Sequence, residues 1–259
     1  MANAHSKDSA VFLDLADVTS YTTSFEYNQT RNLPEITTLG DSTRKYFEGL
    51  HEPTATIEFL WDETAVEGSD TILATVGTAT AAGADDATNI LTYYPKGDAI
   101  GNFGYTGNAA NLNSQTTRTA LDDMVRVTAT FNVANIRTET DPTTAGALAR
   151  IKSTGTKATV TATTNGTTID DGASSSSGAI VTIHIFAFTA SGGSARWLAE
   201  LHHSSDGASW ADFSSNAITG TGSTQTFTVA GTLNRYVRGS VTLDASSGSL
   251  TYHIGYQRL

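Results

Sequence analysis

The sequence predicts an all-β protein with one short helix, organised as two domains. Two observations carry this prediction. Apolar residues make up 39% of the chain and aromatic residues 8%, with Thr, Ser, Ala and Gly abundant, which is typical of short strands joined by small-residue turns. Several segments also alternate between apolar and polar residues, the period of a strand with one buried face. The length of 259 residues allows two ordinary domains.

The N-terminal region shows the clearest alternation, in residues 11–29 and 54–62. In the second of these segments Ile57, Phe59 and Trp61 oppose Thr56 and Glu58. Between the two lies a segment of mixed charged and aromatic residues, 33–53, which we expect to be a long loop. Loops of this length in compact domains usually have a function.

The next region contains the one convincing helix. Ser69 or Asp70 can cap its N-terminus and Gly77 ends it. Its apolar stripe consists of Ile72, Leu73 and Val76. Apolar islands at 90–94 and 101–107 predict further strands, and the alternating run 124–136 predicts a long strand that closes the first domain.

We therefore expect a first domain at residues 1–145, a linker at 146–156 and a second domain at 157–259. The second domain reads as strands separated by Gly- and Ser-rich turns. Its clearest segments are 178–190, 195–204, 224–231, 234–245 and 250–259. This spacing indicates an antiparallel β-sandwich or barrel.

Charge and composition exclude several functions. The formal net charge is −11, with only 15 basic residues, so tight binding to a phosphate backbone is disfavoured. The chain has no cysteine, which excludes disulfides, thiolate metal sites and cysteine nucleophiles. No segment approaches the about 20 apolar residues of a membrane span, and the N-terminus lacks a secretory pattern, so we expect a soluble protein made in the cytoplasm.

No motif predicts catalysis, a cofactor or a metal, and we expect a protein that is not an enzyme. His202 and His203 are adjacent in a predicted strand, so they face opposite ways and cannot easily share an ion. His184 and His253 lie in apolar strands, where packed or hydrogen-bonded imidazoles are common. The acidic pair Asp170–Asp171 is interpreted as a solvated turn. The three tryptophans, Trp61, Trp197 and Trp210, are interpreted as packing residues rather than a sugar platform.

Residues 13–62 resemble the N-terminal half of tail tube proteins of long-tailed (siphovirus-like) phages and related archaeal viruses. The residues that carry this resemblance are Thr37, Thr38, Leu39, Gly40 and Asp41, then Gly49 and Leu50, and finally Trp61 and Asp62. The C-terminal segments LHHSSDGASWADF and VAGTLNRYVRGSVTL also look like the second domain of two-domain tail proteins. Together these segments cover roughly half of the chain, and none is a catalytic signature.

The resemblance implies a tail-tube-type β-sandwich or barrel, followed by a second sandwich that decorates the tube or forms part of its wall. Copies of the chain would join edge to edge into rings, as a hexamer of single tube domains or a trimer of two-domain chains. The loop at 33–53 would contact the adjacent ring in a stacked tube. Candidate contact residues are Leu39, Asp41, Arg44, Lys45, Tyr46, Phe47 and Leu50. From the residues alone, the cluster at 44–47 fits a solvated loop and an inter-subunit contact equally well.

The partners that the resemblance implies are the chain itself and other tail proteins: the tape measure, the tail terminator and the baseplate or tip. Viral DNA would pass through the tube during ejection without specific binding, and no membrane is involved. The protein would be assembled in the host cytoplasm and reside in the virion tail. The alternative function is a carbohydrate-binding or adhesive β-sandwich module of a virion or surface protein.

Overall fold

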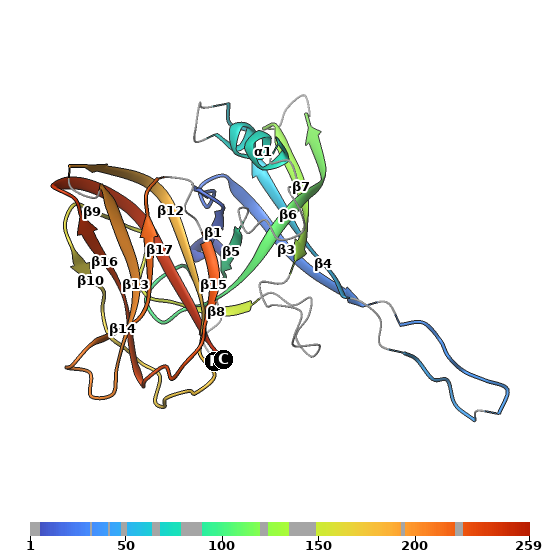
Figure 1. The fold of residues 1–259 in the computed structure, drawn as a ribbon. Coiled ribbons are helices and arrows are strands. Elements are labelled where there is room, and N and C mark those ends of the chain that lie inside the picture. The colour runs from blue at the N-terminus through green and yellow to red at the C-terminus, as the bar shows by residue number, and fades with distance from the viewer. Residues whose placement is uncertain are drawn as a thin grey trace. The chain divides into compact units, whose positions relative to one another are not determined.

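The computed structural model describes residues 6–31, 33–40, 42–47, 51–63, 68–78, 90–119, 124–134, 149–192, 195–220 and 225–259. The chain forms two compact units (Figure 1). Unit 1 comprises Met1–Ser20, Asp86–Thr106 and Ala149–Leu259, and unit 2 comprises Tyr21–Asp85 and Gly107–Leu148. In both units the described residues are mainly antiparallel strands, and α1 is the one α-helix among them. The predicted all-β class is therefore confirmed.

Unit 2 is built on a sheet in the order β3–β4–β7–β6. Its strands are β3 (Thr22–Arg31), β4 (His51–Leu60), β7 (Arg126–Ala134) and the part of β6 (Phe103–Arg118) that follows Thr106. The alternation seen in the sequence sets the buried face, because Ile57 pairs with Ala129 and Phe59 with Val127, and all four side chains are buried.

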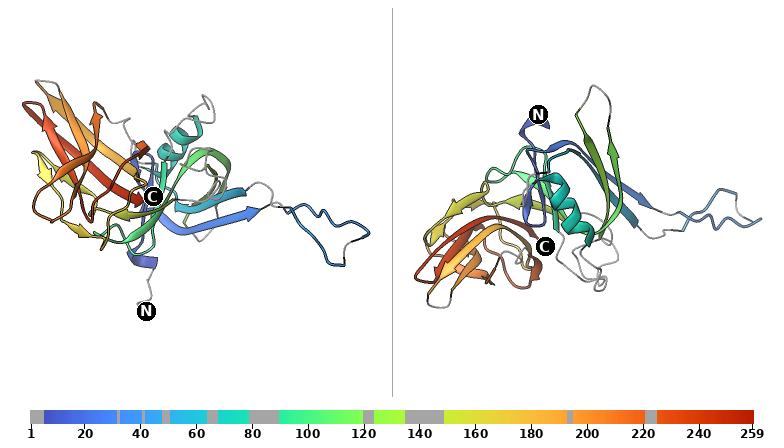
Figure 2. Two further views of the ribbon diagram at one scale, coloured as in Figure 1. Left: turned by 60° about the horizontal axis from the view of Figure 1, so that its bottom comes forward. Right: turned by 90° about the horizontal axis from the view of Figure 1, so that it is seen from above.

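Helix α1 (Ser69–Thr78) forms where the sequence predicts it, and Ile72 and Leu73 are buried. Figure 2 shows the helix running beside the sheet of unit 2. The Ser69 hydroxyl donates to the carbonyl of Leu60 and accepts from the amide of Asp62. Ser69 therefore ties the helix to the end of β4, and the helix extends one residue past Gly77.

Unit 1 contains a β-sandwich. One layer is a five-stranded sheet, and the facing layer is the group β15–β12–β17. The five strands are β10 (Thr164–Asn165), β11 (Ile169–Asp170), β13 (Arg196–Ser204), β14 (Ala211–Ile218) and β16 (Tyr236–Asp244). The facing strands are β12 (Ala179–Ser191), β15 (Gln225–Val229) and β17 (Ser247–Arg258). Apolar side chains of both layers form one buried core, with Trp197 at 0% exposure among them.

The sheet that contains β12 and β17 continues beyond β17. Its further strands are β8 (Ala149–Ser153), the first residues of β6, β5 (Ile90–Tyr94), β1 (Ala10–Leu13) and β2 (Ala16–Asp17). Phe12 of β1 packs on the face of β12 and β17 that points away from the five-stranded sheet. The ring of Phe12 lies 5.6 Å from that of His184 and 5.1 Å from that of His253. The short strand β9 (Ala158–Val160) pairs with β17, and a 3₁₀ turn, η1, spans Ser6–Asp8.

The compact units divide the chain differently from the continuous 1–145 and 157–259 expected from the sequence. Residues 1–20 and 86–106 group with the C-terminal segment, because β1 and β5 pair with each other and their side chains contact β12 and β17. Part of the expected linker also has regular structure, since β8 falls within it. No helix in the described part of the chain is long and apolar enough to cross a membrane.

Candidate assembly interface and the motif residues

Most of the segment expected to be a long loop is an antiparallel hairpin, which we call the arm (the described residues 33–40 and 42–47). The amide of Ile36 donates to the carbonyl of Lys45 at 2.9 Å, and the amide of Phe47 donates to the carbonyl of Pro34 at 2.9 Å. Glu35 and Tyr46 form a bridge between the two sides. Figure 1 shows the arm (blue) continuing beyond the ends of β3 and β4.

The arm exposes large apolar side chains. Five of the nine exposed large apolar residues in the described chain belong to it. They are Leu33 at 51%, Ile36 at 52%, Leu39 at 108%, Tyr46 at 52% and Phe47 at 62% relative exposure. Because a two-stranded hairpin is at best marginally stable in water, and because exposed apolar groups of this size mark contact surfaces, the arm has the character of a docking element.

The candidate contact residues fall on this arm where the structure describes them. Leu39 lies in its turn, while Arg44, Lys45, Tyr46 and Phe47 lie on its returning side and are all exposed. The amide of Lys45 also donates to the hydroxyl of Thr37 at 2.9 Å. Thr37, one of the residues that carry the resemblance to tail tube proteins, therefore helps to hold the two sides of the arm together. Asp41 and Leu50 lie outside the described residues.

The second half of β6 forms one border of the sheet in unit 2. Residues Ser114 to Arg118 pair with β7 on one side, and they are exposed. Among the described strands none pairs with their other side. This stretch therefore presents backbone groups to which a strand of another chain can add.

The two C-terminal motifs, LHHSSDGASWADF and NRYVR, come together in unit 1. The guanidinium of Arg238 lies 4.2 Å from the ring centroid of Trp210, a cation–π contact. The amide of Asn234 donates to Nδ1 of His203 at 3.2 Å. Asp206 holds the turn between β13 and β14, because its carboxylate accepts hydrogen bonds from the amides of Ala208 and Ser209. These hydrogen bonds lower the pKa of the Asp206 carboxyl below its usual value.

The three tryptophans differ in burial. Trp197 is fully buried in the sandwich core, which confirms its predicted packing role. Trp61 is half-buried and donates from Nε1 to Glu63 at 3.0 Å. Trp210 is also half-buried, and Arg238 lies over its ring.

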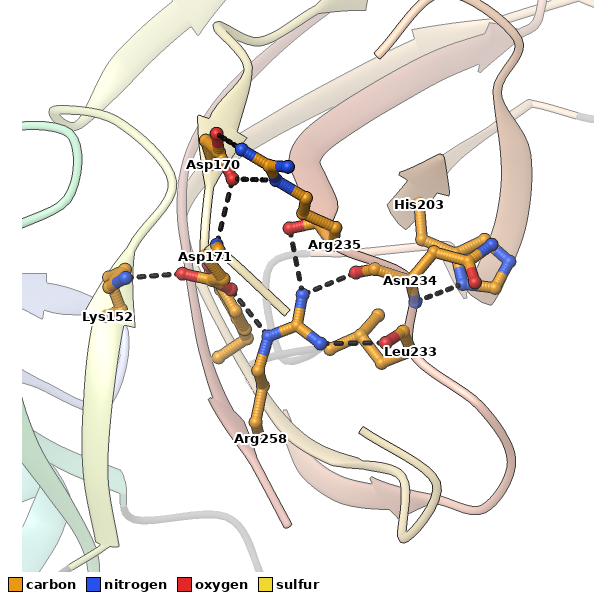
Figure 3. Close-up of polar contacts among 10 residues, drawn as sticks. Lys152, Asp170, Asp171, His203, Leu233, Asn234, Arg235 and Arg258 are labelled. Atoms are coloured by element: carbon orange, nitrogen blue, oxygen red, sulfur yellow. Dashed lines mark hydrogen bonds and ion pairs between the residues drawn. The ribbon is translucent and has the colours of Figure 1, made fainter. Parts of the chain in front are cut away.

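The interpretation of Asp170–Asp171 as a solvated turn is wrong for Asp171, whose side chain is only 6% exposed. Arg258 donates to it from Nε at 2.6 Å, Tyr256 donates at 2.8 Å, and Lys152 forms an ion pair with it (Figure 3). Burial by itself raises the pKa of this carboxyl, but the hydrogen bonds from Lys152, Arg258 and Tyr256 together hold it below its usual value. The sequence analysis missed that Asp171 is buried because its main cationic partner, Arg258, lies 87 residues further along the chain.

Arg258 also holds the loop before β16. Its guanidinium donates to the carbonyl of Leu233 at 2.7 Å, and to the carbonyls of Asn234 and Arg235. Beside it, Arg235 binds the exposed Asp170 through two hydrogen bonds of 2.6 Å (Figure 3). This network joins β8, β11, the loop and β17, so its role in unit 1 is to fix the end of the sandwich.

A third polar cluster, on β13 and β14, consists of Glu200, His202 and Asp212. Nε2 of His202 lies 3.5 Å from Oε2 of Glu200 and 3.1 Å from Oδ1 of Asp212. The expectation that His202 and His203 cannot easily share a metal ion does not bear on this cluster. The neighbours of His202 are Glu200, two residues before it, and Asp212, which lies opposite it on β14. Reasoning from adjacent residues missed it for that reason.

No family model and no curated protein matches the chain. Its structure is similar to that of the Dit protein (gp 19.1) of phage SPP1, described as a paradigm of the hub adsorption apparatus of phages that infect Gram-positive bacteria. That similarity has a TM-score of 0.33 and 13% sequence identity, and covers 96% of this chain and 99% of the other. A structure of the infectious bursal disease virus Gx strain matches with a TM-score of 0.23 and 10% identity, over 98% of this chain and 68% of the other. Similarities with TM-scores this low carry no argument about the function of the chain.

Proposed function

We propose that the chain is a structural virion protein whose copies assemble into stacked rings, forming a tail tube that conducts viral DNA. The observation that carries this proposal is the arm, residues 33–40 and 42–47. It exposes Leu39 at 108% and Phe47 at 62%. In an isolated chain the unfavourable hydration of these apolar side chains would not be offset by any contact with another copy. A neighbouring copy that covered the arm would bury this apolar surface.

The open border of β6 supports the same proposal. Residues Ser114 to Arg118 offer exposed backbone beside a paired strand. Edge strands of this kind are an aggregation hazard in a monomer, and ring closure removes the hazard by pairing each edge with a sibling chain. Arm and edge thus supply two kinds of contact, one between rings and one within a ring.

The charge of the chain suits a conduit. A net charge of −11 repels the phosphate backbone, so DNA would pass a wall made of this protein without adhering to it. The work proposed for the chain is mechanical, with no chemical step, no cofactor and no enzymatic activity. Its proposed place is the virion tail.

Electron microscopy of the purified full-length chain at high concentration tests the proposal. We expect the wild-type chain to form rings that stack into hollow tubes. The double variant L39S/F47S should form rings with little or no stacking, because it removes the two most exposed apolar groups of the arm.

The matched control is M124S. Met124 is 61% exposed, nearly the same fraction as Phe47 at 62%, but it lies outside the arm. The control should form tubes of wild-type length. Discrete monomers of the wild-type chain at high concentration would contradict the whole proposal, while full-length tubes of L39S/F47S would remove the arm from it.

A further inference from the structure

The Glu200–His202–Asp212 cluster lies on the outer face of the five-stranded sheet. Trp197, Ala199 and Leu201 of β13 point into the sandwich core, so the alternating residues Glu200 and His202 face the other way. His202 is paired in register with Asp212 of β14, next to a bulge that follows Leu201. The backbone thus brings one imidazole and two carboxylates together on a rigid pair of strands.

The geometry at Nε2 of His202 is unsuited to an ordinary hydrogen bond. This nitrogen is buried and has no hydrogen-bond partner of acceptable geometry, although two carboxylate oxygens lie 3.1 and 3.5 Å away. When an ion is coordinated tetrahedrally with metal–ligand distances of about 2.1 Å, its ligand atoms lie about 3.4 Å from one another. The two distances fall on either side of that value, and all three ligand atoms lie within 4.8 Å of one another.

The surroundings of Glu200 resemble the support that metal ligands receive. Its side chain is 8% exposed and accepts from the hydroxyl of Thr242 at 2.8 Å and from that of Ser215 at 3.4 Å. These bonds orient a buried carboxylate that would otherwise be costly. Asp212 is 66% exposed on its side chain, which leaves one side of the cluster open to water.

Arg238 is the cation that faces this cluster. Its Nη2 lies 3.4 Å from Nδ1 of His202 while its guanidinium lies over Trp210. An arginine in this place donates to Nδ1 and so puts the imidazole proton on Nε2, where a metal ion must displace it. Arg238 therefore competes with a bound cation.

From this arrangement we propose that Glu200, His202 and Asp212 bind a divalent cation of the zinc type, with water in the remaining position. One imidazole and two carboxylates form a mixed N/O donor set that suits zinc and related transition ions better than calcium or magnesium, which take oxygen ligands alone. This site is independent of the assembly role proposed above. It ties β13 to β14 on the sheet face away from the core.

Titration of the metal-free full-length chain with zinc chloride, followed by calorimetry, tests the site. We expect saturable binding of one equivalent, and at least tenfold weaker binding by D212N. Because Asp212 is exposed, this variant is expected to keep the fold, which circular dichroism checks. R238M should bind zinc several-fold more tightly, since it removes the competing cation.

The matched control is D244N, at a carboxylate that is also solvent-accessible (41% exposed, against 66% for Asp212) and that pairs with Arg196 on the same sheet. It should bind zinc as the wild-type chain does. X-ray absorption of the zinc complex should show light N/O ligands with one imidazole. Absence of saturable binding, or equal affinity of D212N and D244N, would overturn the proposal and leave the cluster as an imidazole paired with two carboxylates.

Discussion

The two faces of the β12–β17 strand pair differ in how they hold unit 1 together. Toward the five-stranded sheet the pair presents Val181, Ile183, Leu250 and Ile254, all buried in an apolar core. Toward β1 and β5 it presents His184, which is fully buried among rings and hydroxyls. The first face is stabilised mainly by apolar packing, and the second only while each polar group keeps its partner and its protonation state.

The polar face has a defined imidazole tautomer. Nδ1 of His184 lies 2.9 Å from the carbonyl of Asp14, so it carries the proton and donates. Nε2 then accepts from the hydroxyl of Thr92 at 2.7 Å. Burial lowers the pKa of His184 to about 4, and burial together with the nearby His184 lowers the pKa of His253 well below the usual value. Both imidazoles are therefore neutral in the folded chain near neutral pH.

W197A should cause the largest loss of stability, because Trp197 of β13 packs in the core against the apolar face of the β12–β17 pair. Trp197 is fully buried and donates from Nε1 to the carbonyl of Thr189 at 3.2 Å. We expect the free energy of unfolding to fall by about 3–5 kcal/mol, from lost packing and the remaining cavity. Urea denaturation measures the loss. The half-buried Trp210 is the control, and W210A should lower the free energy of unfolding clearly less than W197A. Equal losses would contradict the larger contribution expected from the fully buried core.

The polar face should respond to H184L by a smaller, pH-dependent amount. The substitution leaves the carbonyl of Asp14 without this donor and costs about 1–3 kcal/mol near neutral pH. His184 has a folded-state pKa of about 4 against 6.5 unfolded, so its stabilisation is present above pH 6.5 and is lost as pH falls toward 4. The difference in the free energy of unfolding between the wild-type chain and H184L, which we call the gap, should therefore be smaller at pH 4.5 than at pH 7.5.

Urea denaturation at both pH values measures this gap. I183V on the apolar face is the control, because it removes one buried methyl group and no titrating group. It should cost about 0.5–1.5 kcal/mol at either pH. A gap for H184L that stays constant with pH would mean that His184 does not titrate between the folded and unfolded states.

The effect of D14N on the pH dependence of stability has the opposite sign to that of H184L. Burial raises the pKa of Asp14 to about 7, so this carboxyl stabilises the fold below its unfolded value of 3.8 and loses that stabilisation as pH rises toward 7. It therefore opposes His184 over the same range. Asn tolerates the φ of 51° at this position, and D14N should show a steeper rise of stability from pH 4 to pH 7 than wild type. A slope equal to that of wild type would contradict the raised pKa.

The sequence predicts strands well where one face alternates and poorly where contacts are distant. The strand at 124–136 and the helix near Ile72 follow from local periodicity, and both form close to their expected positions. The grouping of residues 1–20 with the C-terminal segment depends on contacts such as that of Phe12 with His184, which no local pattern encodes. The same holds for Asp171, whose partners lie far along the chain.

For the candidate site, composition identified the arm but not its form. Mixed charged and aromatic residues at 44–47 mark a surface segment, yet the hairpin depends on hydrogen bonds across the turn, such as that from Ile36 to Lys45. The cluster at Glu200, His202 and Asp212 could have been noticed from the i, i+2 spacing of its first two members on a strand. Its third member is positioned by strand pairing and by the bulge after Leu201.

The central place of β17 has a consequence for the order in which the protein can fold as it is made. This strand pairs with β12, β8 and β9, yet it spans Ser247–Arg258, near the end of the sequence. Phe12 of β1 rests against His253 of β17, so the face that covers β1 exists only after β17 has also been synthesised. Unit 1 therefore depends on contacts between segments far apart in the chain, which is typical of slowly folding β topologies.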